Sequence, residues 1–378
     1  YLFNLFFTYC LIFNILKVNA SFQSSVFSEV NLDNKGKNVI VSPLSMFQVL
    51  GLTTNGAVGE TQSEMLSTLQ ASNIVNLNSV NLKVIQKVKK FVTVELANGV
   101  MSLFNPIKSF VKICDQYEAP IEKLISKEQV NEWCSDKTHG KITEILDELN
   151  PATVMLLLNA VYFRGEWVYP FNPDDTFDGT FYTAATDTKN AKKAKFMTQT
   201  REFKYYQNKE IQAIELPYKN DSMSAVILLP AKGTDLNNYV NLNKVNDEFI
   251  NTVLDGMVET TVQINLPKFE VEYYGKLKEV LQRLGMVKAF GDADFSGING
   301  AGGLYIDNVI HKTYLKVDEI GSEAAGVTVV DMRKSLPIPN AVVDVNRPFI
   351  LIIKSSELPK GNNFLFMAKI EDFSPDSW

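Results

Sequence analysis

The chain has 378 residues, of which 46% are hydrophobic and 21% charged, and its formal net charge is −6. This is the composition of a globular protein, and no linker, repeat or low-complexity run divides the chain. The acidic balance argues against a nucleic-acid binder.

The first twenty residues differ in kind from the rest. The run from Leu2 to Leu16 is apolar apart from three polar residues, and Val18 and Ala20 place small residues at the spacing of a signal-peptidase site. This run is too short to cross a membrane. No Met or basic segment precedes it, so we interpret residues 1–20 as a signal peptide cut short at its start. A buried N-terminal helix is the alternative. We expect a secreted, extracellular protein without membrane attachment.

Secretion bears on the cysteines and on one sequon. Cys10 lies in the leader, which leaves Cys114 and Cys134. One disulfide between them is compatible with an oxidising compartment, but the sequence does not show that their Cα atoms come close enough. We favour two free, buried thiols. After residue 20 the only N-glycosylation sequon begins at Asn220, in a polar connection that would tolerate a glycan.

The next elements in the chain are predicted as helix, strand and helix. Residues 21–31 form an amphipathic helix, and residues 38–41 a short apolar strand. Ser42 and Pro43 then begin a second helix, because serine is a preferred N-cap and proline suits the first helical position.

A lysine-rich helix is expected over residues 79–92. Lys83, Lys87 and Lys90 recur at spacings of four and three, which places them on one face, and Lys89 lies nearby. Such a run is commonly a solvated face. The alternative is a surface that binds a polyanion.

The middle of the chain contains a helix and a central strand. We predict the helix from Val130 to Leu146. The run from Val154 to Phe163 is almost wholly apolar, which indicates a strand buried on both faces. Asn159 is the one amide in that strand and therefore needs hydrogen-bond partners.

The second half of the chain is mainly strand. Residues 195–230 and 261–273 alternate between apolar and polar side chains. An amphipathic helix follows over 277–284 and ends at a glycine. Two apolar strands, 349–353 and 364–368, close the chain.

The histidines are too few for a multi-histidine metal site, whereas their number alone does not exclude a Ser-His-Asp triad. The only histidines are His139 and His311, and Cys134 stands five residues before His139 without further ligand candidates. No glycine-rich phosphate loop and no nucleophile-elbow serine is present. We expect no metal, no required cofactor and no enzyme activity.

The stretch from Val317 to Pro339 combines a strand pattern with an exposed tip. Uncharged side chains occupy every second position: Ser322, Ala324, Gly326, Thr328, Val330 and Met332. This period of two indicates a strand with one buried face. Arg333, with Lys334 and Ser335 before a proline, indicates an exposed loop. Locally, a mobile surface hairpin fits equally well.

This stretch resembles the hinge of the serpin family. The residues at the hinge positions are Glu319, Gly321, Ser322, Glu323, Ala324, Ala325, Gly326, Val327 and Thr328. Further blocks similar to serpins follow one another in family order from about residue 21 to 375: 38–45, 56–61, 130–133, 138–142, 159–167, 266–269, 311–312, 346–349 and 364–367. Two hinge residues depart from the family pattern, since Ile320 replaces an acid and Val327 an alanine.

The resemblance implies one α+β domain over residues 21–378. Its parts would be a large mixed five-stranded sheet A, two further sheets, about eight to nine helices and an exposed reactive-centre loop. The helix from Ser42 would run beneath sheet A, and the helix from Val130 across its front.

The resemblance also implies two functional positions in sheet A. The shutter, a polar cluster beneath the centre of the sheet, would contain Ser42, Ser45, Asn159 and His311. Trp167 would mark the breach at the top of the sheet, where the strands part to admit the loop. A passive core network and a core tryptophan are the alternative interpretations.

The function implied by the resemblance is that of a monomeric, secreted inhibitor that traps a serine protease covalently. Counting from Gly321 puts Ser335 before the scissile bond, whereas counting back from Asn346 puts Lys334 there. A lysine fits a trypsin-like pocket with an aspartate at its floor. We therefore predict Lys334–Ser335 as the reactive bond, with Arg333–Lys334 second, and a trypsin-like protease as partner.

Two other functions stay open at this point. One is a non-inhibitory serpin that serves as a carrier or storage protein. The other is a polyanion-binding protein that uses Lys83, Lys87, Lys89 and Lys90 to bind heparin or another glycosaminoglycan. Heparin binding is also compatible with inhibition, because the polyanion can accelerate it as a cofactor.

Overall fold

The computed structural model describes residues 21–183, 191–220, 222–241, 245–322 and 338–372. These residues contain ten α-helices. Their bounds are α2 Phe22–Leu32, α3 Pro43–Thr54, α4 Gly59–Thr68, α5 Ile74–Val88, α6 Lys108–Gln116, α7 Lys127–Lys137, α8 Leu236–Asn241, α9 Asp247–Asp255, α10 Lys278–Arg283 and α11 Ser296–Asn299.

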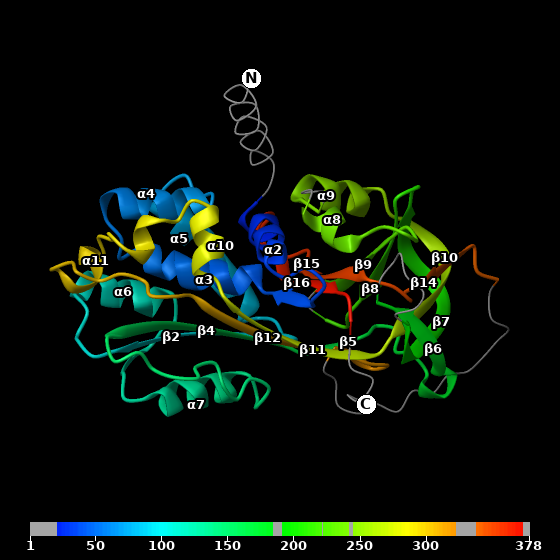
Figure 1. The fold of residues 1–378 in the computed structure, drawn as a ribbon, viewed down its shortest axis with the longest axis horizontal. Coiled ribbons are helices and arrows are strands. Elements are labelled where there is room, and N and C mark those ends of the chain that lie inside the picture. Colours follow the sequence, from blue (N-terminus) through cyan, green and yellow to red (C-terminus); the bar gives the residue numbers. More distant parts are fainter. Residues whose placement is uncertain (1–20, 184–190, 221, 242–244, 323–337, 373–378) are drawn as a thin grey trace, which may run out of the picture.

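Helices and strands occur largely in separate runs along the chain, as expected for an α+β protein (Figure 1). The bounds of the strands are β1 Val39–Val41, β2 Val94–Ser102, β3 Ile121–Lys123, β4 Met155–Phe163, β5 Gly165–Glu166, β6 Phe177–Tyr182, β7 Ala191–Gln207, β8 Ile211–Pro217, β9 Met223–Pro230, β10 Val258–Pro267, β11 Phe269–Lys276, β12 Ile310–Val317, β13 Gly321–Ser322, β14 Ala341–Asp344, β15 Phe349–Ser355 and β16 Phe364–Ile370.

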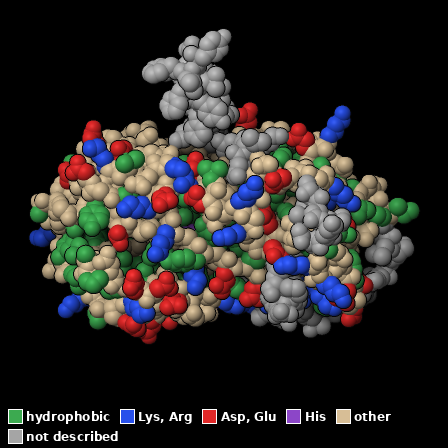
Figure 2. Space-filling model, viewed as in Figure 1, with side chains coloured by type: hydrophobic (Ala, Val, Ile, Leu, Met, Phe, Trp, Pro, Cys, Tyr) green, Lys and Arg blue, Asp and Glu red, His purple; other side chains and the backbone are tan. Residues whose placement is uncertain are grey.

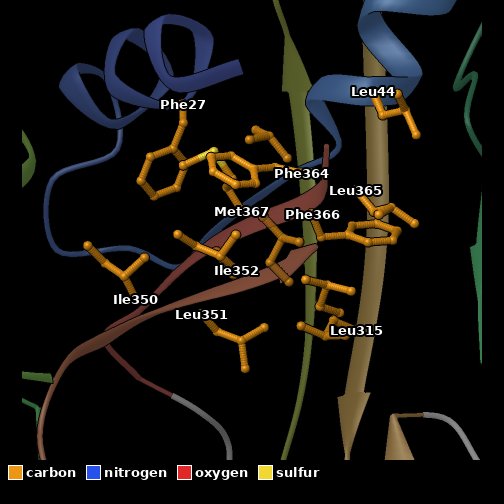
Figure 3. Packing of buried hydrophobic residues seen from close by; sticks show 14 of the residues in the cluster. Phe27, Leu44, Leu315, Ile350, Leu351, Ile352, Phe364, Leu365, Phe366 and Met367 are labelled. Atoms are coloured by element: carbon orange, nitrogen blue, oxygen red, sulfur yellow. The ribbon is translucent and has the colours of Figure 1, made fainter. Parts of the chain in front are cut away.

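Nine strands make the largest sheet and carry the centre of the core. Their order is β1-β16-β15-β9-β8-β7-β10-β14, with β6 paired to β7. Every residue of β9 and β16 is buried, as expected for strands covered on both faces. Figure 3 shows Phe27 of α2, Leu44 of α3 and Leu315 of β12 gathered round the β15–β16 pair.

The five strands that the resemblance assigns to sheet A are all present, in two hydrogen-bonded groups. One group has the order β3-β2-β4, and the other is the antiparallel pair β11–β12. Within the described residues, no strand pairs with the remaining edge of β4 or of β12. We call the space between these two edges the seam.

Helices cover both faces of the first group. α3 packs against β4 from the core side, while α7 lies on the opposite face (Figure 1). Trp133 of α7 packs so closely on β2 that a Cβ added at Gly99 would lie 3.0 Å from its ring. The predicted strand over 154–163 is confirmed and is covered on both faces, although its side chains are only half-buried because the seam is open.

Two predicted helices have different ends in the structure. α5 begins at Ile74 and ends at Val88, where Asn73 caps its first turn, so Lys89 and Lys90 lie beyond it. α7 ends at Lys137 rather than continuing to Leu146. The reason is local: His139 and Gly140 both have a positive φ, which a right-handed helix does not accommodate.

Candidate functional site

The start of the hinge closes the end of the seam at which β4 and β12 finish. After β12 the chain turns at Asp318, whose Oδ1 accepts from the backbone N–H groups of Ile320 at 3.0 Å and Gly321 at 3.3 Å. This turn directs β13 back toward β5, and the two strands pair antiparallel. The first two hinge residues on the loop side of the turn, Gly321 and Ser322, are therefore already docked as a short strand.

Gly321 is required at this position because two backbones meet there. A Cβ on Gly321 would lie 1.9 Å from the carbonyl oxygen of Gly165 in β5. A Cβ on Gly165 would in turn lie 2.6 Å from the rings of Phe163 and Tyr218. Neither position has room for a side chain, so the two glycines allow β13 and β5 to approach.

The next hinge residue, Ser322, is held by an aromatic pair. Ser322 is fully buried, and its Oγ lies 2.7 Å from the hydroxyl of Tyr218. The Tyr218 ring stacks on Trp167 at a centroid distance of 4.4 Å. Trp167 donates from Nε1 to the carbonyl oxygen of Asp318 at 3.0 Å. The structure thus places the predicted breach residue, Trp167, in direct contact with the turn that leads into the hinge.

An ion pair fixes the hinge on its other side. Glu319 is buried, and its carboxylate lies 2.8 Å from Nζ of Lys268 and accepts from Oγ1 of Thr176 at 2.9 Å. Burial alone would raise the pKa of Glu319, but the hydrogen bonds from Lys268, its own backbone and Thr176 hold the pKa below its ordinary value. Glu319 is therefore an anion that anchors the turn.

Away from the hinge, where β4 and β12 begin, the seam opens into a cavity of about 680 Å³. Its walls come from β4, β12, α3 and α7 and from the connections that precede β4 and β12. Among the lining residues are Val49, Ile145, Leu157, Asn159, Ile306 and Ile310. The cavity thus lies between two strands with unpaired edges, along the first half of β4 from Met155 to Asn159.

Ser45, Asn159 and His311, three of the four predicted shutter residues, line this cavity, and Ser42 is hydrogen-bonded to two of them. His311 of β12 accepts at Nε2 from the backbone N–H of Ser42 at 3.0 Å, and Ser42 Oγ accepts from the N–H of Ser45. The Ser45 hydroxyl donates to Oδ1 of Asn159 in β4. The α3 N-terminus therefore links the two sides of the seam through hydrogen bonds. These hydrogen bonds bring all four predicted residues together in one cluster.

Burial makes His311 a neutral acceptor. The side chain is buried, and burial lowers its pKa to about 4. Because Nε2 accepts from Ser42, the proton of the neutral ring belongs on Nδ1. Protonation of Nε2 would replace this hydrogen bond with two facing donors.

Asn98 extends the cluster, and sequence reasoning missed it. Asn98 of β2 stands directly opposite Asn159 in the β2–β4 register and accepts from its Nδ2 at 2.7 Å. It also donates to the carbonyl oxygen of Tyr117 at 2.9 Å. The signal was present, because Asn98 is the single amide of its strand, and a buried amide requires hydrogen-bond partners. Tyr218, which holds Ser322, had no comparable signal.

The segment after α7 covers the seam from outside. The His139 ring contacts the Tyr162 ring of β4 at 4.5 Å, and Lys141 lies over the Tyr314 ring of β12 at 5.2 Å. A third contact joins Lys312 of β12 to the carbonyl oxygen of Glu144 at 2.9 Å. The two sides of the seam are thus fastened together by a surface segment, here called the clasp (residues 139–144).

The remaining predicted sites lie on the surface or outside the described residues. All four lysines at the end of α5 are exposed, but Lys87 pairs with Glu357 at 3.2 Å and Lys89 with Glu118. Asn220 is exposed in the turn between β8 and β9. The leader, the hinge residues from Glu323 to Thr328, and the reactive bond at Lys334–Ser335 lie outside the described residues.

The prediction of free cysteines is confirmed. Cys114 and Cys134 are both buried and unpaired with each other. Burial raises the pKa of Cys114 to about 12 and that of Cys134 to about 11, so both remain thiols at neutral pH.

Comparison with known proteins decides the family. The family model described as Serpin (serine protease inhibitor) matches residues 17–373. The chain belongs to the serpin family. Intracellular coagulation inhibitor 2 of Tachypleus tridentatus is 33% identical over 90% of this serpin and 86% of its own length. Human antithrombin-III is 29% identical over 95% and 82%, respectively.

Solved serpin structures show the same fold. The thermophilic serpin tengpin in the native state is 31% identical and covers 95% of this serpin and 94% of its own chain, with a TM-score of 0.83. Membership of an inhibitor family agrees with the expectation that this serpin is not an enzyme. Within the described ranges, no three metal-binding side chains cluster, and no helix has the length and apolar character of a membrane span.

Proposed function

We propose that this serpin inhibits a trypsin-like serine protease by a suicide-substrate reaction. The protease serine attacks the carbonyl carbon of Lys334, and the bond to Ser335 breaks. Ser335 then leaves as a new amine with the C-terminal fragment, while Lys334 stays esterified to the protease. Insertion of the hinge into the seam carries the acylated protease away before water can release it.

The docked start of the hinge is the observation that carries this proposal. Gly321 and Ser322 already pair with β5 at the end of the seam where β4 and β12 finish. Beyond them, β4 and β12 each have an edge without a strand among the described residues. A strand that continued from Ser322 would find backbone donors and acceptors on both sides, which is strand addition in its simplest form.

The side chains of the hinge suit such an insertion. Ser322 is fully buried, and strand periodicity would place Ala324, Gly326 and Thr328 on the same face. All four are small and uncharged, so insertion avoids both overpacking and the burial of an unpaired charge. A carrier serpin has no need for this restriction, which favours the inhibitory function over the carrier function.

Lysine at the reactive bond supports a trypsin-like target. A trypsin-like protease recognises a basic residue through an aspartate in its pocket. Arg333–Lys334 is the second choice of bond, and it predicts the same class of protease.

We also propose that the protein acts outside the cell. The apolar leader and the small residues at Val18 and Ala20 support this location. The word "intracellular" in the name of the Tachypleus tridentatus relative favours the opposite location. Expression of the chain with an initiator Met in eukaryotic cells separates the two. If the chain is secreted, the protein in the culture medium should begin at Ser21. An uncleaved chain that stays in the cytosol would contradict secretion.

A polyanion is a further proposed partner, through the lysines of α5. Figure 2 shows charges of both signs mixed over the face in view. A polyanion would therefore bind to the local cluster of lysines, because this face has no general positive field. Lys83 and Lys90 form no ion pair with a described residue, unlike Lys87 and Lys89. We expect Lys83→Ala with Lys90→Ala to lower the salt needed for elution from heparin more than Lys35→Ala with Lys37→Ala does. Equal elution of the two double variants would contradict this surface.

One gel tests the inhibitory proposal. Chain 21–378 is mixed with trypsin in slight deficit and run under denaturing conditions. We expect a band at the summed mass and a released fragment that begins at Ser335. Lys334→Ala should abolish the band, whereas Arg333→Ala should keep it. Complete cleavage without a summed band would contradict inhibition and support the carrier function.

A further inference from the structure

The residue that follows the predicted leader is tied to one carboxylate. The backbone nitrogen of Ser21 lies 2.7 Å from Oδ2 of Asp247, and the Ser21 hydroxyl donates to the same carboxylate at 2.8 Å. Asp247 is the first residue of α9, which is more than 220 positions away in the sequence. This contact therefore joins the first residue of the expected mature chain to a distant helix.

Two more side chains complete the set of donors around Asp247. Gln23 donates from Nε2 to Oδ1 at 2.8 Å, and the Ser24 hydroxyl donates to Oδ2. All the donors come from residues 21–24 at the start of α2, beside α8 and α9 in Figure 1. Asp247 is half-buried, and no described lysine or arginine lies within ion-pair distance of it. Among the described residues, this carboxylate is surrounded by hydrogen-bond donors but has no cation.

We propose that removal of the leader after Ala20 supplies that cation. Hydrolysis consumes one water molecule, gives Ala20 the new carboxylate and gives Ser21 the new α-amine. At neutral pH this amine carries an extra proton, because an ordinary α-amino group has a pKa of about 7.7–8.0. The amide hydrogen bond to Asp247 thus becomes a charge-assisted ion pair at an atom that is already in place. This inference rests on the proposed secretion in one respect, because the cell removes the leader only if the protein is secreted. The ion pair itself can form in any chain that begins at Ser21.

The electrostatics of the two helix ends favour this arrangement. A positive α-amine at the start of α2 would by itself be unfavourable, since the N-terminal end of a helix already carries partial positive charge. Asp247 stands at the N-terminal ends of both α2 and α9 and neutralises this charge. Leader removal would therefore fasten α2 to α9, and an uncleaved or differently cleaved chain would lack the ion pair.

The test compares chains that differ by one residue. Chain 21–378 and chain 20–378 are prepared from fusions whose removal leaves those first residues. A third sample is chain 21–378 acetylated at Ser21, which keeps the N–H but removes the charge. We expect hydrogen exchange in the first hydrogen-bonded turn of α2 to be about tenfold faster in the longer and acetylated chains than in chain 21–378.

The variant Asp247→Asn identifies the partner. In this background chain 21–378 should no longer exchange more slowly than the other two forms. Glu248→Gln is the matched control, because it removes a carboxylate from the same first turn of α9 and should leave the tenfold difference intact. Equal exchange of chains 21–378 and 20–378 with Asp247 present would overturn the proposal, as would slower exchange of chain 21–378 that survives Asp247→Asn.

The acetylated sample keeps the proposal testable if Asp247→Asn does not fold. Exchange as slow as that of chain 21–378 would show that charge is irrelevant and would overturn the pairing. The same preparations are mixed with trypsin to separate this inference from the proposed function. A tenfold difference without a covalent adduct supports the pairing even though inhibition fails, and an adduct without the difference overturns the pairing alone.

Discussion

His311 illustrates at the scale of one residue how burial determines chemistry. Two histidines occur in the chain, yet only His311 is buried, where its neutral ring accepts from the backbone of Ser42 across the seam. His139 is exposed and contacts Glu95 at 3.1 Å. The same side chain therefore has two different roles, a core acceptor and a surface contact.

The first prediction concerns the pH dependence that follows from His311. Its pKa in the folded protein is about 4, below the ordinary 6.5, so the unfolded chain binds more protons between these values. Stability is therefore lost as the pH falls below about 6.5. A shift of this size predicts a loss of about 2 kcal/mol in unfolding free energy between pH 7.5 and 5.

Urea unfolding at these two pH values measures this loss. His311→Gln retains an acceptor and does not titrate, so its stability should change with pH by about 2 kcal/mol less than that of the unsubstituted chain. His139→Gln is the control and should behave like the unsubstituted chain. An equal pH dependence of the His311→Gln variant and the unsubstituted chain would contradict the assignment.

The second prediction concerns Gly321. Alanine there would place Cβ 1.9 Å from the Gly165 carbonyl oxygen, so β13 would be forced away from β5. We expect a loss of about 1–3 kcal/mol in unfolding free energy. The emission of Trp167, which contacts the hinge turn, should shift to longer wavelength.

A glycine with open space around it provides the control. An added Cβ at Gly291 would meet no atom within 4 Å, so Gly291→Ala should leave the Trp167 emission unchanged. The close-approach argument is wrong if Gly321→Ala gives the same emission and stability as the unsubstituted chain.

At the scale of elements, β4 and β12 are strands whose inner edges lack a described strand partner. The clasp holds them from outside through Tyr162, Tyr314 and Lys312. The shutter holds them from inside through α3. These links are a few side-chain contacts rather than a backbone ladder, so a strand can enter the seam by replacing them with hydrogen bonds along both edges.

The third prediction is that a peptide with the sequence of residues 322–332 binds in the seam. Its small uncharged face would point into the cavity, as argued for the hinge itself. A hundredfold excess over Kd would add about 2.7 kcal/mol to the unfolding free energy. Because the peptide occupies the place of the hinge, trypsin should then cleave the protein without forming an adduct.

A single charge supplies the matched control. The same peptide with aspartate at the position of Ala324 would bury an unpaired carboxylate and should not bind. Equal stabilisation by both peptides would show that binding occurs elsewhere, and the seam would then not be the insertion site.

At the scale of the whole molecule, the open seam implies that a form with a strand in the seam would have a lower free energy than the native form. The described structure holds only Gly321 and Ser322 of the hinge against β5. Insertion of the remaining residues would add backbone hydrogen bonds along two strands. The proposed insertion therefore implies a native form that a kinetic barrier keeps from converting to a more stable one.

The fourth prediction follows from this difference. Cleavage in the loop frees the hinge to insert, and about ten new backbone hydrogen bonds at about 1 kcal/mol each should stabilise the cleaved form by roughly 10 kcal/mol. Thermal unfolding followed by circular dichroism should show a far higher Tm after cleavage. A cleaved form that melts at or below the Tm of the intact chain would rule out insertion.

Sequence alone determined the family, the α+β class and most of the elements. A continuous apolar run indicated β4, and an N-cap serine before a proline indicated the start of α3, because both signals are local. The four shutter residues were named beforehand only through the resemblance to serpins. The end of α7 was predicted too late, because Gly140, which has a positive φ, was not recognised as a local signal that stops a helix.

Only the tertiary structure decided how distant residues combine. Asn98 opposite Asn159, Tyr218 against Ser322 and Asp247 against Ser21 are contacts between segments far apart in the chain. No local pattern encodes them, because each depends on the register of strands or the packing of helices that the whole core fixes. The same reason applies to the seam, since an unpaired strand edge is a property of the assembled sheet and not of either strand.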